Sequence, residues 1–480
     1  MNYLKYLTLI LAASLITSCG NDWLDVEPST SIQTESGVKS LKEVEFSLNG
    51  IYSTMQSADA YSGRLVYYAD VTGDDMQAVS STKRTANYYR FNFTKDNGPS
   101  SHWAYLYNII QNCNVVLASL DRITANDAEK AYRNDLRGQA LAIRGMALFD
   151  LTRIFGYPYT KDGGASMGVP IIETVSGTED KPSRSSVAEC YTHIISDLKS
   201  ASELLGEKFN KGKFNKWAAL TLLSRVYLYK GENEEALKAA KSAIEGAEKN
   251  GYALWSNKAY PTAWGADASS ADQGEVLFEI VNLTTDSPGK ESMGYLNSKD
   301  GYDDMCITAS FYRLLKENPR DVRLKLMSFD GKQYAYVNKY QPQPGENIAD
   351  ANIPLLRLSE AYLNAAEAAV KTGDNATAVT YLDAIVHRAD PDSTVKGKTL
   401  TLANVLNERR KELVAEGHRM YDVMRNGLSI KREDVEESAI SRTRHDTPYM
   451  EYDRTFYMIV LPIPKGEIDA NPNIKQNPGY

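Results

Sequence analysis

The stretch WAALTLLSRVYLYKGENEEALKAAKSAIEGAE, residues 217–248, decides the fold. Its large apolar side chains recur at three- and four-residue steps up to Gly231, and alanines then continue the same spacing. This pattern is typical of two antiparallel helices joined by a tight turn, where small side chains let the helices approach closely. It predicts a helical pair of the tetratricopeptide type.

Two further segments carry the same helical spacing. A second pair is predicted over 356–389, with Gly373 at its turn, and a helix over 131–155 that ends at Gly156. Because these units are dispersed, the material between them must fold against the helical frame. The expected fold class is mostly α, a tetratricopeptide-like scaffold of helical pairs (an α-α superhelix) with long irregular insertions and a few short strands.

Three long segments are poor in helix signals and rich in Gly, Ser, Asp, Asn and aromatic residues: 61–99, 157–186 and 251–303. Within the last of these, EVLFEIV at 275–281 predicts a strand. Insertions of this length in a compact protein usually carry function. We therefore expect one ligand-binding face, built from insertions on a rigid helical scaffold.

The start of the chain predicts export and a lipid anchor. Lys5 precedes a short apolar stretch at 7–16, which fits a secretory signal and is too short to span a bilayer. Small residues then lead to Cys19, as in a lipobox. Residues 1–18 are therefore interpreted as a lipoprotein signal peptide, and Cys19 as the lipidated residue that holds the chain at the membrane by its acyl chains alone.

Composition excludes several classes of function. The 480 residues carry a net charge of −8, which disfavours nucleic acid as a ligand. The cysteines other than Cys19 are widely spaced and odd in number, so Cys113, Cys190 and Cys306 are expected to be buried apolar residues. The five histidines show no metal-ligand spacing. We predict no metal and no cofactor.

Three blocks stand in order in the last third of the chain: NIPLLRLSEAYLNAAE at 352–367, ERRKELVAEGHRMYD at 408–422, and LPIP at 461–464, followed by NPNIKQNPGY at 471–480. Together with the N-terminus they resemble the SusD/RagB family of surface nutrient-binding lipoproteins. The resemblance implies a single SusD-like domain over 19–480, with the family's C-terminal region at 352–480. It also implies a non-enzymatic protein on the outer-membrane surface, which captures oligosaccharide and hands it to a SusC-like TonB-dependent transporter.

Ligand residues are sought in the insertions, because the family's ligand contacts vary with substrate. A sugar ring stacks its apolar face on an exposed aromatic plane while polar side chains bind its hydroxyls. The chain holds 31 Tyr against 11 Phe, and tyrosine suits such half-buried surfaces. The ligand-binding candidates are Asp74, Asp75, Tyr88, Tyr89, Trp255, Tyr260, Trp264 and Tyr295.

Two other functions stay open at this point. One is a helical scaffold or adaptor lipoprotein without a small-molecule ligand. The other is a glycoside hydrolase, for which the sequence offers many acidic pairs but no way to measure their separation. The charged run at 408–412 is interpreted as a salt-bridged helix face rather than a catalytic cluster. Which glycan is bound cannot be deduced from the sequence.

Overall fold

The computed structural model describes residues 38–177, 179–265, 274–331 and 334–480, so Cys19 lies outside the described residues. Helices dominate. They are α2 (Leu41–Met55), α3 (Arg64–Val71), α4 (Ala86–Tyr89), α5 (Ser101–Arg122), α6 (Lys130–Phe155), α7 (Val187–Leu204), α8 (Lys216–Lys230), α9 (Asn233–Lys249), α10 (Met293–Leu296), α11 (Ala309–Lys316), α12 (Leu358–Thr372), α13 (Asn375–Ala389), α14 (Leu402–Glu412), α15 (Arg419–Arg425) and α16 (Lys465–Ala470).

The predicted helical pairs are confirmed. Residues 217–248 form α8 and α9, residues 356–389 form α12 and α13, and residues 131–155 form α6. Gly231 ends α8 with φ of +88°, and Gly373 ends α12 with φ of +82°. This left-handed conformation costs glycine little, which is why glycine stands at both turns.

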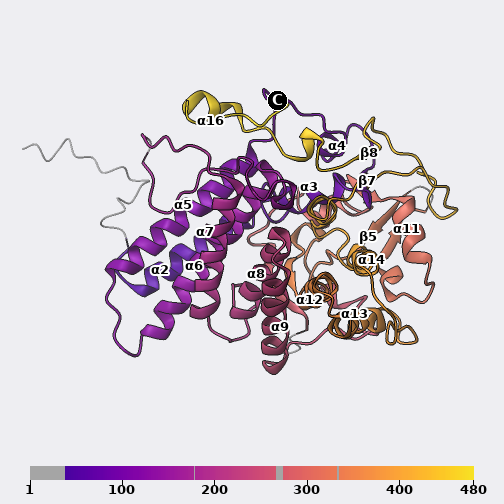
Figure 1. Ribbon diagram of the computed structural model, residues 1–480, viewed down its shortest axis with the longest axis horizontal. Helices are drawn as coiled ribbons and strands as arrows, with labels where there is room; N and C mark the ends of the chain where they lie inside the picture. Colours follow the sequence, from indigo (N-terminus) through magenta and orange to yellow (C-terminus); the bar gives the residue numbers. More distant parts are fainter. Residues whose placement is uncertain (1–37, 178, 266–273, 332–333) are drawn as a thin grey trace, which may run out of the picture.

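The helices stack in a continuous series. Helix α2 packs on α5, then α5 on α6, α6 on α7, α7 on α8 and α8 on α9. Helix α12 packs against α9 and α13, so the second predicted pair stacks directly on the first. Figure 1 shows this series running from α2 and α5 on the left, through α8 and α9, to α13 and α14 on the right. The fold is therefore the expected scaffold of helical pairs.

The strands are short and pair two by two, all antiparallel. The pairs are β1 (Met76–Ala78) with β3 (Met305–Ile307), β2 (Val276–Ile280) with β6 (Ile353–Arg357), β4 (Met327–Phe329) with β5 (Ala335–Val337), and β7 (Ile430–Lys431) with β8 (Glu451–Tyr452). The strand predicted at 275–281 is confirmed as β2. Strand β1 lies in the first insertion and pairs with β3, which directly follows the third, so these two segments come together.

The first insertion is more helical than predicted, because it contains α3 and α4. Helix α3, RLVYYADV, has every residue but the first buried. A helix that is buried all round shows no apolar stripe, so periodicity alone cannot detect it. The expectation of an irregular 61–99 segment was wrong at these positions.

The C-terminal tail, residues 461–480, crosses the helical body without regular secondary structure apart from the short helix α16, since its prolines disfavour a longer helix. The backbone N–H of Leu461 donates to the carbonyl of Ile154 at 2.8 Å. The Asn477 side chain donates to the carbonyls of Phe155 and Leu461, at 2.9 and 2.8 Å. The tail therefore fastens onto the end of α6. Across the described ranges, no helix combines the length and hydrophobicity that crossing a membrane requires.

Candidate functional site

The candidate site is an aromatic surface where the first and third insertions meet. Tyr295 and Tyr302 pack edge to face, with ring centroids 4.8 Å apart, and both are half-buried. The guanidinium of Arg84 lies 4.0 Å from the centre of the Tyr302 ring, and Lys290 Nζ lies 5.7 Å from that of Tyr295. We call this set, with Glu291 and Asp303, the Tyr295–Tyr302 surface.

A tight turn holds the two tyrosines side by side. The backbone N–H of Tyr302 donates to the carbonyl of Tyr295 at 2.9 Å, and that of Gly301 donates to Ser298 at 3.1 Å. A Cβ at Gly301 would lie 2.0 Å from the Tyr295 carbonyl oxygen. Only glycine permits this approach of the two backbone segments. The geometry of the pair is therefore set by the turn rather than by the side chains.

Charged side chains flank the rings in a hydrogen-bonded chain. Arg84 Nε donates to Glu291 at 3.1 Å, and Glu291 also accepts from Arg64 at 3.3 Å. Lys83 Nζ donates to the Tyr302 carbonyl at 2.5 Å and lies 3.8 Å from an Asp303 oxygen. Arg84 and Glu291 keep 38% and 47% of their side-chain surface exposed. Planar groups held in place beside ring faces can bind hydroxyls while an apolar face stacks.

Of the eight predicted ligand residues, the structure brings Tyr295 to this surface and places the others elsewhere. Tyr260 and Trp264 are 0% and 5% exposed and pack edge to face, with centroids 5.6 Å apart, beside half-buried Trp255. Arg388 lies 4.2 Å from the Tyr260 ring centre, and Arg357 4.8 Å from that of Trp264. This placement differs from the expected exposed ring faces, because both rings are buried, whereas Tyr295 and Tyr302 are half-buried.

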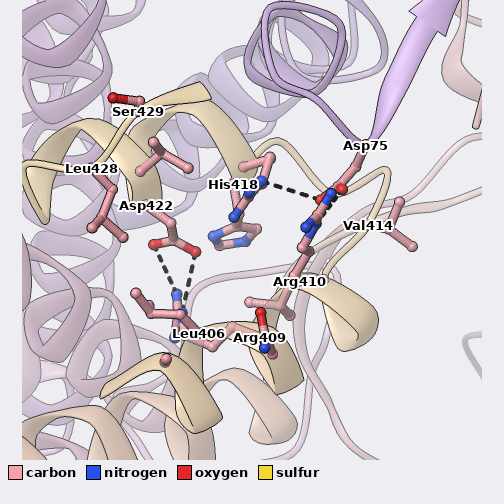
Figure 2. A pocket seen from close by; sticks show the side chains of 14 residues that line it. Asp75, Leu406, Arg409, Arg410, Val414, His418, Asp422, Leu428 and Ser429 are labelled. Atoms are coloured by element: carbon pink, nitrogen blue, oxygen red, sulfur yellow. Dashed lines mark hydrogen bonds and ion pairs between the residues drawn. The ribbon is translucent and has the colours of Figure 1, made fainter. Parts of the chain in front are cut away.

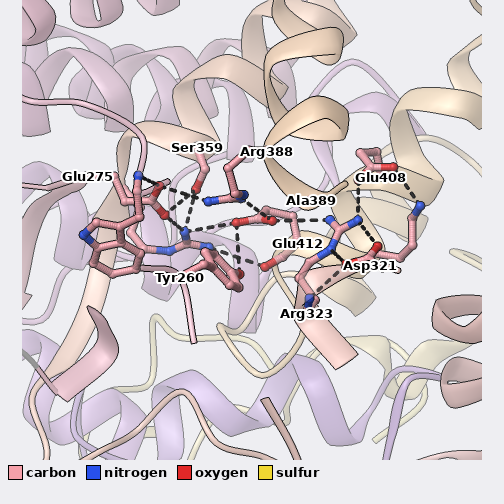
Figure 3. Close-up of polar contacts among 12 residues, drawn as sticks. Tyr260, Glu275, Asp321, Arg323, Ser359, Arg388, Ala389, Glu408 and Glu412 are labelled. Carbon is pink, nitrogen blue, oxygen red and sulfur yellow. Dashed lines mark hydrogen bonds and ion pairs between the residues drawn. The ribbon is translucent and has the colours of Figure 1, made fainter. Parts of the chain in front are cut away.

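Beneath these aromatics lies a buried network of charges centred on Glu412 (Figure 3). Glu412 lies 2.6 Å from Arg388, 3.2 Å from Arg357 and 3.3 Å from Arg323. Burial opposes ionisation of Glu412, but attraction to these arginines outweighs it and lowers the pKa. The charged run at 408–412 is thus structural, as predicted. The salt bridges do not lie within one helix face, however, since most of the partners come from other elements.

Tyr88 and Tyr89 are also buried and paired. The Tyr88 hydroxyl lies 3.0 Å from His102 Nε2, and that of Tyr89 lies 2.8 Å from His445 Nδ1. The guanidinium of Arg432 lies 4.5 Å from the Tyr89 ring centre. Both tyrosines therefore serve as packing residues in this conformation. They follow α3, whose burial was not detectable in the sequence.

The ligand-binding candidates Asp74 and Asp75 are buried and paired with arginines. Asp74 accepts two hydrogen bonds from Arg419, at 2.5 and 2.9 Å, and Asp75 accepts one from Arg410 Nε. Asp75 also lines a pocket of about 140 Å³ with Arg410 and His418 (Figure 2). The pair joins the first insertion to α14 and α15.

Sequence reasoning missed Tyr302, Arg84 and Glu291, although all three lie in segments predicted to carry function. The available signal was the run GYDD at 301–304, a turn sequence with an aromatic residue. The three cysteines Cys113, Cys190 and Cys306 are buried and free, as expected.

Comparison with known proteins identifies the family. Residues 329–480 match the model described as the SusD family, and residues 22–228 match one described as starch-binding and associating with the outer membrane. A SusD superfamily protein of Bacteroides thetaiotaomicron has 37% sequence identity and a TM-score of 0.83, over 92% of this chain and 100% of its own. The chain belongs to the SusD family. A crystal structure titled as a putative sugar binding protein of Bacteroides vulgatus is similar to this SusD-family protein, with 73% identity and a TM-score of 0.92, over 93% of this chain and 100% of its own.

A shorter match concerns the starch-binding protein SusD of Bacteroides thetaiotaomicron. It is 32% identical to this SusD-family protein over 148 residues, which are 30% of this chain and 24% of its own. The expected family and fold are thus confirmed by independent relatives. Starch and sugar are the ligands that the names of these two relatives give for those proteins.

Proposed function

We propose that this chain is a cell-surface lipoprotein that captures oligosaccharide at the Tyr295–Tyr302 surface and delivers it to a SusC-like TonB-dependent outer-membrane transporter. The observation that carries the proposal is the half-buried pair of tyrosines, framed by Arg84 and Glu291. A sugar ring stacks on such a ring face, and fixed guanidinium and carboxylate groups bind its hydroxyls. The names of the sugar-binding and starch-binding relatives support the same ligand class.

The lipid anchor and the transporter complete the proposal. Cys19 is the proposed site of acylation, and family membership supports attachment to the outer membrane. Tethering raises the effective concentration of the protein beside its transporter, so a modest interface is sufficient for delivery. Copurification of a large β-barrel protein after extraction in mild detergent tests the partner. Recovery of the chain alone, under conditions that preserve other membrane complexes, contradicts it.

Binding is tested by isothermal titration calorimetry against oligosaccharides of starch, laminarin, fructan, mannan and arabinan. We expect one class to bind, and Tyr302→Ala to weaken its Kd about tenfold, which corresponds to about 1.4 kcal/mol. Tyr132→Ala is the matched control, because Tyr132 is 38% exposed on α6, away from the site. An equal effect of both variants would refute the assignment of the surface.

Experiments with the same oligosaccharides also distinguish the proposed function from a scaffold and from a glycoside hydrolase. A helical scaffold without a small-molecule ligand gives no heat with any glycan. A glycoside hydrolase shortens the oligosaccharides during incubation, which chromatography of the mixture detects. We expect the bound glycan to be recovered at its original length, since the proposed site binds through ring stacking and hydroxyl contacts and requires no pair of catalytic carboxylates.

A further inference from the structure

A second pocket lies between α14 and α15, apart from the Tyr295–Tyr302 surface (Figure 2). Its walls are largely apolar, and Leu406, Val414 and Leu428 are among its lining residues. Asp75 reaches it from the segment just before β1. A cavity with apolar walls and a few convergent polar groups is the usual form of a small-molecule site.

Two deeply buried polar side chains that line this pocket each have one atom without a hydrogen-bond partner among the described residues. His418 is 4% exposed, its Nδ1 is buried, and its ring forms no hydrogen bond with any described residue. Asp75 is 1% exposed, and its Oδ2 accepts no hydrogen bond, although Arg419 Nε lies 3.3 Å away. Buried polar atoms are nearly always satisfied. His418 Nδ1 and Asp75 Oδ2, on two residues that line one cavity, are therefore positions at which a bound molecule would complete the hydrogen bonding.

More hydrogen-bonding groups face the same space. Arg410 uses only Nε in hydrogen bonds with described residues, and its Nη2 lies 3.8 Å from an oxygen of Asp74, so its terminal amino groups retain hydrogen-bonding capacity. Asn407 and Ser429 also line the pocket, and neither side chain forms a hydrogen bond within the described ranges. The pocket therefore offers acceptors at Asp75 and donors at Arg410, with groups able to do either at Asn407 and Ser429. A ligand must present both donors and acceptors, as adjacent hydroxyls do.

The charges of the pocket are balanced. Arg409 pairs with Asp422 at 3.2 Å, Arg419 with Asp74 at 2.5 Å, and Arg410 with Asp75. Burial and repulsion from neighbouring arginines lower the pKa of His418 well below its usual range, so its ring is neutral. Each charged arginine and aspartate that lines the pocket thus has a partner of opposite charge among the described residues. The electrostatics favour a neutral polar ligand.

The volume limits the size of that ligand. A water molecule needs about 10–15 Å³ of such space, so the pocket holds roughly ten non-hydrogen atoms. This is the size of one pyranose ring with most of its hydroxyls. We propose that the pocket is a second binding site, which takes a single neutral sugar unit through Asp75, Arg410 and His418.

The proposal is tested on the purified full chain by ligand-observed NMR with the methyl glycosides of glucose, galactose, mannose and xylose. Acetate and inorganic phosphate serve as anionic probes. We expect at least one glycoside to bind with millimolar Kd. Ala403→Trp, at an exposed position of α14 that lines the pocket, should weaken this binding at least tenfold by filling the cavity.

Three further variants show whether the loss of binding is specific to the pocket. Ala376→Trp adds the same bulk at an exposed position of α13, and we expect it to leave binding unchanged. Asn407→Leu, a smaller change at an exposed position, provides a second test if Ala403→Trp lowers the melting temperature. Tyr302→Ala should weaken oligosaccharide binding about tenfold and leave monosaccharide binding unchanged, so the two sites are tested independently.

Absence of binding by every glycoside overturns the proposal. So does binding that Ala403→Trp and Asn407→Leu both leave unchanged, because the ligand then lies elsewhere. Preferential binding of acetate or phosphate, lost in the same variants, identifies an anion site and also overturns the choice of a neutral sugar.

Discussion

Replacement of Glu412 by glutamine tests the buried charge network most directly. Glutamine keeps the size of the side chain but removes one negative charge that faces Arg388, Arg357 and Arg323. Glu412 is fully buried, so water cannot replace the lost interaction. Removing one partner from a buried ion pair typically costs about 3–5 kcal/mol, because the remaining charges are left uncompensated.

This cost converts into a measurable shift in melting temperature. At about 2.1 cal/mol/K per residue, unfolding a body of roughly 430 residues carries an entropy of about 0.9 kcal/mol/K. We therefore expect Glu412→Gln to lower Tm by about 3–6 °C at pH 7 in differential scanning calorimetry. Glu245→Gln is the control, since Glu245 is exposed on α9 and forms no ion pair with a described residue.

The pH dependence distinguishes a charge effect from a packing effect. The pKa of Glu412 is lower in the folded state than the value of about 4.3 expected in the unfolded chain. Its ionised form therefore contributes stability above that pH, and the contribution is lost as pH falls further. The difference in Tm between wild type and Glu412→Gln should narrow below pH 4. A difference that stays constant from pH 7 to pH 3.5 would refute the electrostatic reasoning.

Three further predictions follow from other features. Trp264→Ala should lower the free energy of unfolding by about 3–5 kcal/mol in denaturant titration, because it opens a cavity over buried arginines; unchanged stability with weaker glycan binding would restore a ligand role. Gly301→Ala should displace the turn beside Tyr295 and weaken oligosaccharide binding in calorimetry, whereas Gly466→Ala, at a position with open space, should not. Cys19→Ala should move the protein from the membrane to the soluble fraction, and unchanged fractionation contradicts the anchor.

The helical frame could be predicted from the sequence because its signals are local. The Gly231 and Gly373 turns, with alanines after each, fix two helical pairs within short windows. The apolar run at 275–281 likewise predicted strand β2. In these places residues that are close in sequence determine the backbone conformation, and contacts between distant residues are not needed to predict it.

The candidate site could be predicted only in part, because exposure depends on distant contacts. Trp264 and Tyr295 stand in the same insertion and look alike as sequence, yet only Trp264 is covered by Arg357. Tyr302 became a candidate only when Arg84 was found above its ring, from a segment more than 200 residues earlier. No local sequence pattern shows which loops lie against each other in the folded protein.

The ion pairs of Asp74 and Asp75 also constrain the order in which the protein can fold. Asp74 pairs with Arg419, which lies 345 residues later in the chain. The Asn477 side chain, which fastens the tail onto α6, likewise lies 322 residues after Phe155. A growing chain therefore cannot complete the contacts of its first third until Arg419 and Asn477 have been synthesised, and truncations that remove them should leave Asp74 and the end of α6 without these partners.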